Sequence, residues 1–173
     1  MARPQAFNTE EVLHKAMEVF WSKGYESTSL VDLLNATKLS KSSLYATFGG
    51  KRALFLAAFD KYRKNREQEI SQALDRGSGR EGIEHFFYMI IEGARTSDFS
   101  NGCMSINQAV EMAPHDSDVC TRVKQDFQAM EKFLTQAIER GRADGSVKGC
   151  KTAHELARIT CSGVSWAPSD GAG

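Results

Sequence analysis

A stretch of seven residues, 41–47, carries side chains that could read the edges of DNA bases. It offers one cation, several hydroxyl groups and a methyl group, interrupted by a single leucine. The major groove of DNA presents hydrogen-bond donors, acceptors and thymine methyl groups that fit such side chains. The residues that would face the groove are Lys41, Ser42, Ser43, Tyr45, Ala46 and Thr47.

The apolar residues around this stretch predict two short helices joined by a tight turn. Ser40 can accept a hydrogen bond from the free amides of a helix that begins at Lys41. Leu44 and Phe48 lie four residues apart, so they share one face and can dock, with Leu39, on a preceding helix. That helix has its own apolar set, Leu30, Leu33 and Leu34. Two short helices in this arrangement have the form of a helix-turn-helix DNA reader.

Two glycines end the second of these helices, and a lysine begins the next one. Gly49 and Gly50 break the helix, and Lys51 opens a longer helix whose N-terminal amides are free to hold a phosphate. The charge of Lys51 adds to these amides. A phosphate site is therefore expected at Lys51.

The order and spacing of these residues resemble the DNA-binding domain of the TetR family of bacterial transcriptional regulators. The residues that carry the resemblance are Gly24, Tyr25, Thr28, Ser29, Ser40, Leu44, Tyr45, Phe48 and Lys51. It implies that Tyr45 and Lys51 hold backbone phosphates, and that Thr28 and Ser29 do so at the start of the preceding helix. The base contacts that it implies come from Lys41, Ser42, Ser43, Ala46 and Thr47.

Two residues depart from the family pattern. Lys38 stands where the turn of the family usually has glycine, so we expect a left-handed backbone at a residue less suited to it. Leu34 replaces a smaller alanine, which changes the packing of the two short helices. Neither change removes a DNA contact.

Charge is distributed unevenly along a chain whose formal net charge is zero. Residues 1–66 hold eleven Lys and Arg against six Asp and Glu, and the rest of the chain has the opposite excess of five. A basic head on an acidic body is expected of a protein that binds phosphate with one end only.

The helical periodicity of the remaining chain predicts an all-α fold in three parts. We expect a helix-turn-helix head at 1–50, a connecting helix at 51–76 and a helical body at 77–173. The resemblance implies that this body binds the effector and forms the dimer. The apolar repeat weakens from Cys161 to Trp166 and Pro168 ends it, which predicts a short last helix and a disordered tail.

Aromatic and methionine residues of the body are candidates for an apolar effector pocket, although most residues of these types form cores. The candidates are Phe86, Phe87, Met89, Ile90, Met104, Met112, Phe127 and Met130. Their periodicity alone does not identify a ligand.

Cys103 is a second candidate for sensing. It follows Asn101 and Gly102 at the start of a short predicted helix, where free amides would stabilise a thiolate and make it reactive toward oxidants or electrophiles. The alternative is a buried, inert cysteine.

Other classes of protein lack support in the sequence. No HExxH, GxSxG or phosphate-cradling glycine motif occurs, and the histidines and four cysteines lack metal spacing, so we expect no enzyme, no metal and no cofactor. No signal peptide and no apolar run of about 20 residues is present, which favours the cytoplasm over a membrane.

These observations predict a homodimeric regulator, most often a repressor in such families, on a palindromic double-stranded DNA operator. An unknown small molecule or electrophile sensed in the body would release it. The alternative is a small-molecule or redox-sensing helical protein whose short last helix impairs dimerisation and weakens operator binding.

Overall fold

The protein folds as an all-α chain in a computed structural model that describes residues 7–95 and 101–164. Eight helices and no strands occur in these ranges. They are α1 (Thr9–Lys23), α2 (Leu30–Thr37), α3 (Lys41–Phe48), α4 (Lys51–Leu74), α5 (Gly79–Arg95), α6 (Met104–Glu111), α7 (Ser117–Ala143) and α8 (Ala153–Val164). The predicted fold class is confirmed. The tail predicted to be disordered, 165–173, lies outside the described residues.

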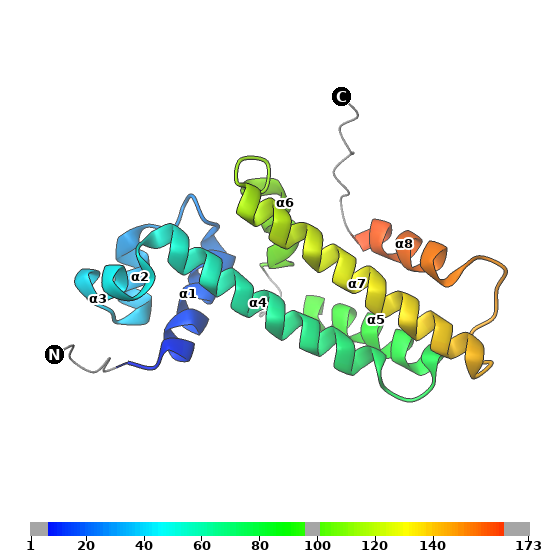
Figure 1. The fold of residues 1–173 in the computed structure, drawn as a ribbon. Coiled ribbons are helices and arrows are strands. Elements are labelled where there is room, and N and C mark those ends of the chain that lie inside the picture. The colour runs from blue at the N-terminus through cyan, green and yellow to red at the C-terminus, as the bar shows by residue number, and fades with distance from the viewer. Residues whose placement is uncertain (1–6, 96–100, 165–173) are drawn as a thin grey trace, which may run out of the picture.

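The longest two helices, α4 and α7, give the molecule its elongated shape (Figure 1). Helices α1, α2 and α3 gather at one end of α4 and form the head. Helix α7 runs beside α4 and also packs against α5, α6 and α8. The head is therefore carried at the end of a long helix whose remaining length belongs to the body.

Two hydrophobic cores lie along this axis. The first joins the head to the near half of α4 and also includes residues of α6 and α7, such as Met104 and Val119. The second core holds the far half of α4 together with α5, α7 and α8. The first core crosses the predicted boundaries near residues 50 and 76, and the second crosses the one near residue 76, because α4 and α7 each contribute side chains to both cores.

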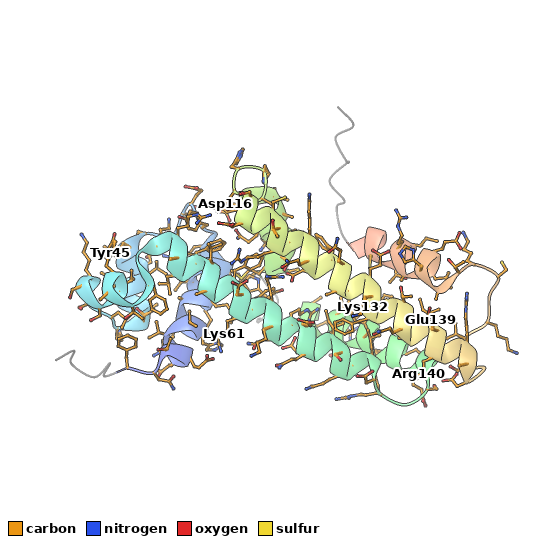
Figure 2. The ribbon with its side chains drawn as sticks, viewed as in Figure 1. Tyr45, Lys61, Asp116, Lys132, Glu139 and Arg140 are labelled. Atoms are coloured by element: carbon orange, nitrogen blue, oxygen red, sulfur yellow. The ribbon has the colours of Figure 1, made fainter. Side chains whose placement is uncertain are left out.

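Glycines allow very close packing at the end of the body remote from the head. A Cβ atom at Gly79 would lie 2.1 Å from the backbone nitrogen of Gly141, and one at Gly82 would lie 2.0 Å from the carbonyl oxygen of Leu74. The side chain of Arg140, labelled in Figure 2 at this end of α7, donates to the same carbonyl. The start of α5 is thus fixed between the last turns of α4 and α7.

Candidate nucleic-acid interface and ligand cavity

Helix α3 is anchored on one side and exposed on the other. Ser40 caps it by accepting from the amide of Ser43 at 3.1 Å, which confirms the predicted start, and Leu44 is fully buried. On the opposite side Lys41, Ser42 and Ala46 are exposed, as is Tyr45. Figure 2 shows Tyr45 on the head, at the end of the molecule opposite α8. Ser43 and Thr47 are half-buried at the margin of this surface.

The serine hydroxyls at the start of α3 form a small cluster. The Oγ atom of Ser40 lies 3.0 Å from Oγ of Ser42 and 2.8 Å from Oγ of Ser43. Each hydroxyl can still rotate to offer a donor or an acceptor to a second partner. The cluster therefore holds these two side chains in place without using up their hydrogen-bonding capacity.

The junction of α3 and α4 gathers groups that suit a phosphate. Gly49 and Gly50 have φ values of +85° and +144°, and no side chain caps α4, so the amides of its first turn lack a side-chain partner. The Nζ atom of Lys51 lies 4.3 Å from the ring centroid of Tyr25. The Tyr45 ring packs beside Gly50. An anion at this point would meet helix amides and a lysine together.

Thr28 and Ser29 occupy different environments at the corner between α1 and α2. Ser29 is exposed and caps α2 through a capping box with Asp32. Thr28 is only 1% exposed, and its hydroxyl donates to the carbonyl of Gly24 at 2.5 Å. This hydroxyl thus closes the corner inside the head, whereas the phosphate contact that the resemblance implies at Thr28 stays a prediction.

A cavity of about 270 Å³ lies in the body between α4, α5, α6 and α7. Its walls are mainly apolar, with a group of polar side chains on α4, α6 and α7. The lining residues are Arg63, Arg66, Glu67, Ile70, Ile90, Cys103, Ser105, Ile106, Gln125, Asp126, Phe127, Ala129, Met130 and Phe133.

Three of the eight candidate pocket residues line this cavity, and five lie elsewhere. Ile90, Phe127 and Met130 face it. Phe86 is buried in the far core, and Met104 and Met112 are buried in the core shared with the head. Met89 packs against the far core, whereas Phe87 is 38% exposed on the surface of α5. These five residues do not line the cavity, because helical periodicity identifies buried faces and does not distinguish a packed face from one that borders a cavity.

The polar side of the cavity links three helices, and the sequence analysis missed it. The carboxylate of Asp126 on α7 accepts from Nε of Arg63 on α4 at 2.6 Å and from the Ser105 hydroxyl on α6 at 2.5 Å. Burial raises the pKa of Asp126, although both donors oppose that shift. The sequence does indicate this polar group, because the charged residue Asp126 stands beside Phe127 in an otherwise apolar stripe. The predicted pocket contained only apolar residues and therefore did not include it.

Cys103 lies at the edge of the same cavity, directly before α6. It is half-buried, and its Sγ atom accepts from the hydroxyl of Tyr62 at 3.5 Å. Burial raises the pKa of Tyr62, so that the hydroxyl remains a neutral donor. The same hydroxyl accepts from the amide of Met104 at 3.2 Å. The thiol is thus accessible from the cavity and tied to α4 through Tyr62.

The described parts of the chain hold neither a candidate metal site nor a helix that could span a membrane. Residues 7–95 and 101–164 contain no group of three or more His, Cys, Asp or Glu side chains that could hold a metal ion. No helix within these ranges combines the length and apolar character needed to cross a membrane.

Comparisons with known proteins cover both parts of the chain. Residues 12–58 match the family model for bacterial regulatory proteins, tetR family, and residues 79–167 match that for the tetracyclin repressor-like C-terminal domain. The uncharacterised HTH-type transcriptional regulator YezE of Bacillus subtilis (strain 168) is 34% identical over 150 residues, which are 86% of this chain and 77% of YezE. The HTH-type transcriptional repressor ComR of Escherichia coli (strain K12) is 31% identical over 175 residues, with 98% and 83% covered.

A solved structure with a similar fold contains DNA. It is a cysteine mutant of the TetR family transcriptional regulator CifR, complexed with a 26 bp double-strand operator. The TM-score is 0.81 at 29% sequence identity, and the match covers 94% of this chain and 85% of the CifR chain.

Proposed function

Since the chain belongs to the TetR family of bacterial regulatory proteins, we propose that it is a homodimeric repressor that releases a palindromic operator when a signal reaches its body. It is a DNA-binding transcriptional regulator and not an enzyme. Its proposed location is the bacterial cytoplasm, where its operator DNA lies.

The observation that carries this proposal is the two-sided character of α3. Leu44 anchors the helix, while Lys41, Ser42 and Ala46 stand exposed on the opposite side. We assign base contacts to Lys41, Ser42, Ser43, Ala46 and Thr47, each good contact contributing about 1 to 3 kcal/mol of discrimination.

A second set of residues would hold the DNA backbone. Tyr45 and Lys51 flank the uncapped start of α4, and Ser29 is exposed at the start of α2. We assign phosphate contacts to these three side chains. Such contacts fix the register of the head and make binding depend on salt.

The symmetry of a dimer determines the form of the operator. Two heads related by a two-fold axis would contact two half-sites in inverted orientation, separated by about 34 to 36 Å or a multiple of one helical turn. The complex of CifR with a 26 bp double-strand operator supports duplex DNA as the partner.

The cavity is the proposed binding site of the small molecule or electrophile that acts as the signal. Ile90, Phe127 and Met130 offer an apolar surface to a small molecule, and Cys103 offers a nucleophilic sulfur at the same place. A bound molecule, or an electrophile attached to the sulfur, would favour an arrangement in which the heads have the wrong separation. This coupling requires that the signal have different affinities for the two arrangements.

The experiment that tests the function is selection of binding sites from random duplex DNA by the purified protein at physiological salt. Non-specific binding is weak under these conditions, whereas specific binding persists. We expect enrichment of an inverted repeat. Enrichment of a single half-site would contradict the dimer and favour the alternative with impaired dimerisation, which a mass measurement in solution would check. A folded protein that enriched no sequence would overturn the proposal.

A further inference from the structure

Helix α6 lies between the cavity and the corner of the head where α1 meets α2. At its N-terminal end the carbonyl oxygen of Gly102 accepts from Nε1 of Trp21 on α1 at 2.9 Å. At its C-terminal end the Oε1 atom of Glu111 accepts from the backbone amide of Glu26 at 2.9 Å. Both bonds join residues more than 80 positions apart in the sequence. Helix α6 is thus attached to the head at both ends.

The carboxylate of Glu111 fits closely into the corner of the head. Gly24 has a φ of +79°, and a Cβ atom there would lie 2.8 Å from Oε1 of Glu111. The other carboxylate oxygen accepts from Nε2 of Gln108 at 3.1 Å. Gln108 is 1% exposed, so its side chain is held by the surrounding core. Glu111 is therefore fixed from its own helix while it binds the backbone of the head.

The residues at the other end of the same helix line the cavity. Cys103, Ser105 and Ile106 contribute to its wall, and the hydroxyl of Ser105 donates to Asp126 on α7. A molecule that displaced these residues would also displace α6. Because α6 binds the corner between α1 and α2 directly, this route to the head does not pass along α4.

We infer that Glu111 is a positioning residue, which sets the orientation of the head relative to the body through the amide of Glu26. This inference rests on the proposed function, because the orientation of the two heads determines which half-site spacing the dimer accepts. Loss of the Glu111 acceptor leaves the head attached to α6 only through Trp21 and the shared core, so it adopts a wider range of orientations.

The test compares Glu111→Ala, Glu111→Gln and the control Val110→Ala on a set of selected operators. The set contains the selected inverted repeat and versions with one base pair inserted or deleted between the half-sites. Val110 is the preceding residue and is 69% exposed, so its replacement controls for a change in α6 itself. We expect Glu111→Ala to lose affinity about tenfold on the preferred spacing, the factor given by an ordinary charge-assisted hydrogen bond. It should lose less on the altered spacings, so that the spacing preference becomes weaker.

Glu111→Gln should restore the preference, because its amide oxygen can accept from Glu26. The amide of Gln108 can turn to suit it, since Oε1 of Gln108 is buried without a hydrogen-bond partner and would then accept from the new amide. An unchanged spacing preference in Glu111→Ala would overturn the inference. Equal losses on all spacings would also overturn it, since they indicate reduced stability alone.

Hydrogen exchange separates this inference from the proposed function. If the wild-type protein selects no operator, the proposed function fails, and the role of Glu111 is decided by amide exchange in residues 24–28. We expect faster exchange there in Glu111→Ala than in Glu111→Gln, with the exchange of α7 unchanged. Equal exchange in the two variants would overturn the inference.

Discussion

The guanidinium of Arg52 lies against the carboxylate of Asp116, with Nε 2.9 Å from Oδ2 and Nη2 3.0 Å from Oδ1. Arg52 is the second residue of α4, next to Lys51, and Asp116 caps α7 by accepting from the amides of Asp118 and Val119. Figure 2 shows Asp116 at the end of α7 that is nearer the head. This pair joins the start of α4 to the start of α7, directly behind the proposed phosphate site.

Replacement of Asp116 by Asn should reveal a stability contribution that depends on pH. Arg52 holds the pKa of Asp116 below its ordinary value of 3.8. A carboxyl group whose pKa is lowered on folding stabilises the protein above its unfolded pKa, and this contribution is lost as the pH falls through the folded pKa. Asn can still cap α7, so the variant removes mainly the ion pair. In chemical denaturation, the unfolding free energy of the wild type should exceed that of Asp116→Asn by an amount that is constant from pH 5 to 7 and shrinks below about pH 4. A difference that grew on acidification would contradict this role.

Replacement of two lysines should separate base reading from phosphate binding. Lys51→Ala is expected to weaken binding to all sequences alike and to reduce the slope of log affinity against log salt by about 1. Lys41→Ala should weaken binding and also change the preferred sequence. Lys124→Ala, an exposed change on α7, is the control. Fluorescence anisotropy on the selected operator and its single-base variants measures both effects. Losses in both variants with the preference unchanged would show that α3 is wrongly placed in the groove.

Alkylation of Cys103 should release DNA. The thiol borders the cavity, and a group attached to its sulfur would displace the hydroxyl of Tyr62, which donates to that sulfur. Treatment with iodoacetamide is expected to lower operator affinity about tenfold. This factor lies in the usual range for the coupling free energy between two binding sites. Cys103→Ser should not respond, whereas Cys150→Ser, which removes an exposed thiol, should respond like the wild type. Burial raises the pKa of Cys161 to about 11, so this thiol should stay unmodified in mass spectra. An equal response in Cys103→Ser would exclude Cys103 as the sensor.

Replacement of Lys38 by Gly should stabilise the head. Lys38 has a φ of 59° and a ψ of 19°, and no other described residue except glycine has a positive φ. The left-handed conformation costs an ordinary residue about 1 to 2 kcal/mol, and glycine removes this cost. Part of the gain is offset, because glycine loses more conformational entropy on folding than lysine does. A net gain of about 0.5 to 1 kcal/mol is expected in chemical denaturation. Asn35→Gly, inside α2, should have the opposite sign. A loss of stability in Lys38→Gly would mean that this side chain makes a favourable contact.

Replacement of Gly79 by Ala should destabilise the far end of the body. The new methyl group would lie 2.1 Å from the backbone of Gly141, which cannot move aside as a side chain could. A cost of about 3 kcal/mol, the upper part of the usual range for overpacking, is expected in chemical denaturation. Glu84→Ala, on an exposed position of the same helix, should change stability by less than about 0.5 kcal/mol. A cost equal to that of the control would show that the two backbones can separate.

The bounds of α3, the proposed DNA-reading helix, could be predicted because their determinants are local. Ser40, Leu44 and Gly49 lie within ten residues, and each acts on the helix to which it belongs. The left-handed backbone at Lys38 was predicted from the resemblance, because the family usually has glycine at this position, and it is confirmed. The environment of Thr28 could not be predicted in this way. Its hydroxyl donates to the carbonyl of Gly24 at the end of α1, which its position before α2 did not reveal.

The cavity depends on contacts between distant helices, and the sequence predicted less of it. Phe86 and Ile90 lie one turn apart on α5, yet the first is packed in the core and the second borders the cavity. Which of them faces open space depends on how α4, α6 and α7 approach. The pairing of Arg63 with Asp126 is likewise set by tertiary packing, because 63 positions separate the two residues.

Because the far end of the body is fixed, a small tilt of α4 is enough to displace the head. Helix α4 has 24 residues, so it is about 36 Å long. If its far end is held by the close contacts of Gly79 and Gly82, a tilt of about one degree moves its other end by about 0.6 Å. A tilt of about five degrees moves α3 by about 3 Å, nearly the rise of one base pair. An angular change that costs the body only small rearrangements is therefore enough to take a head out of register with its half-site.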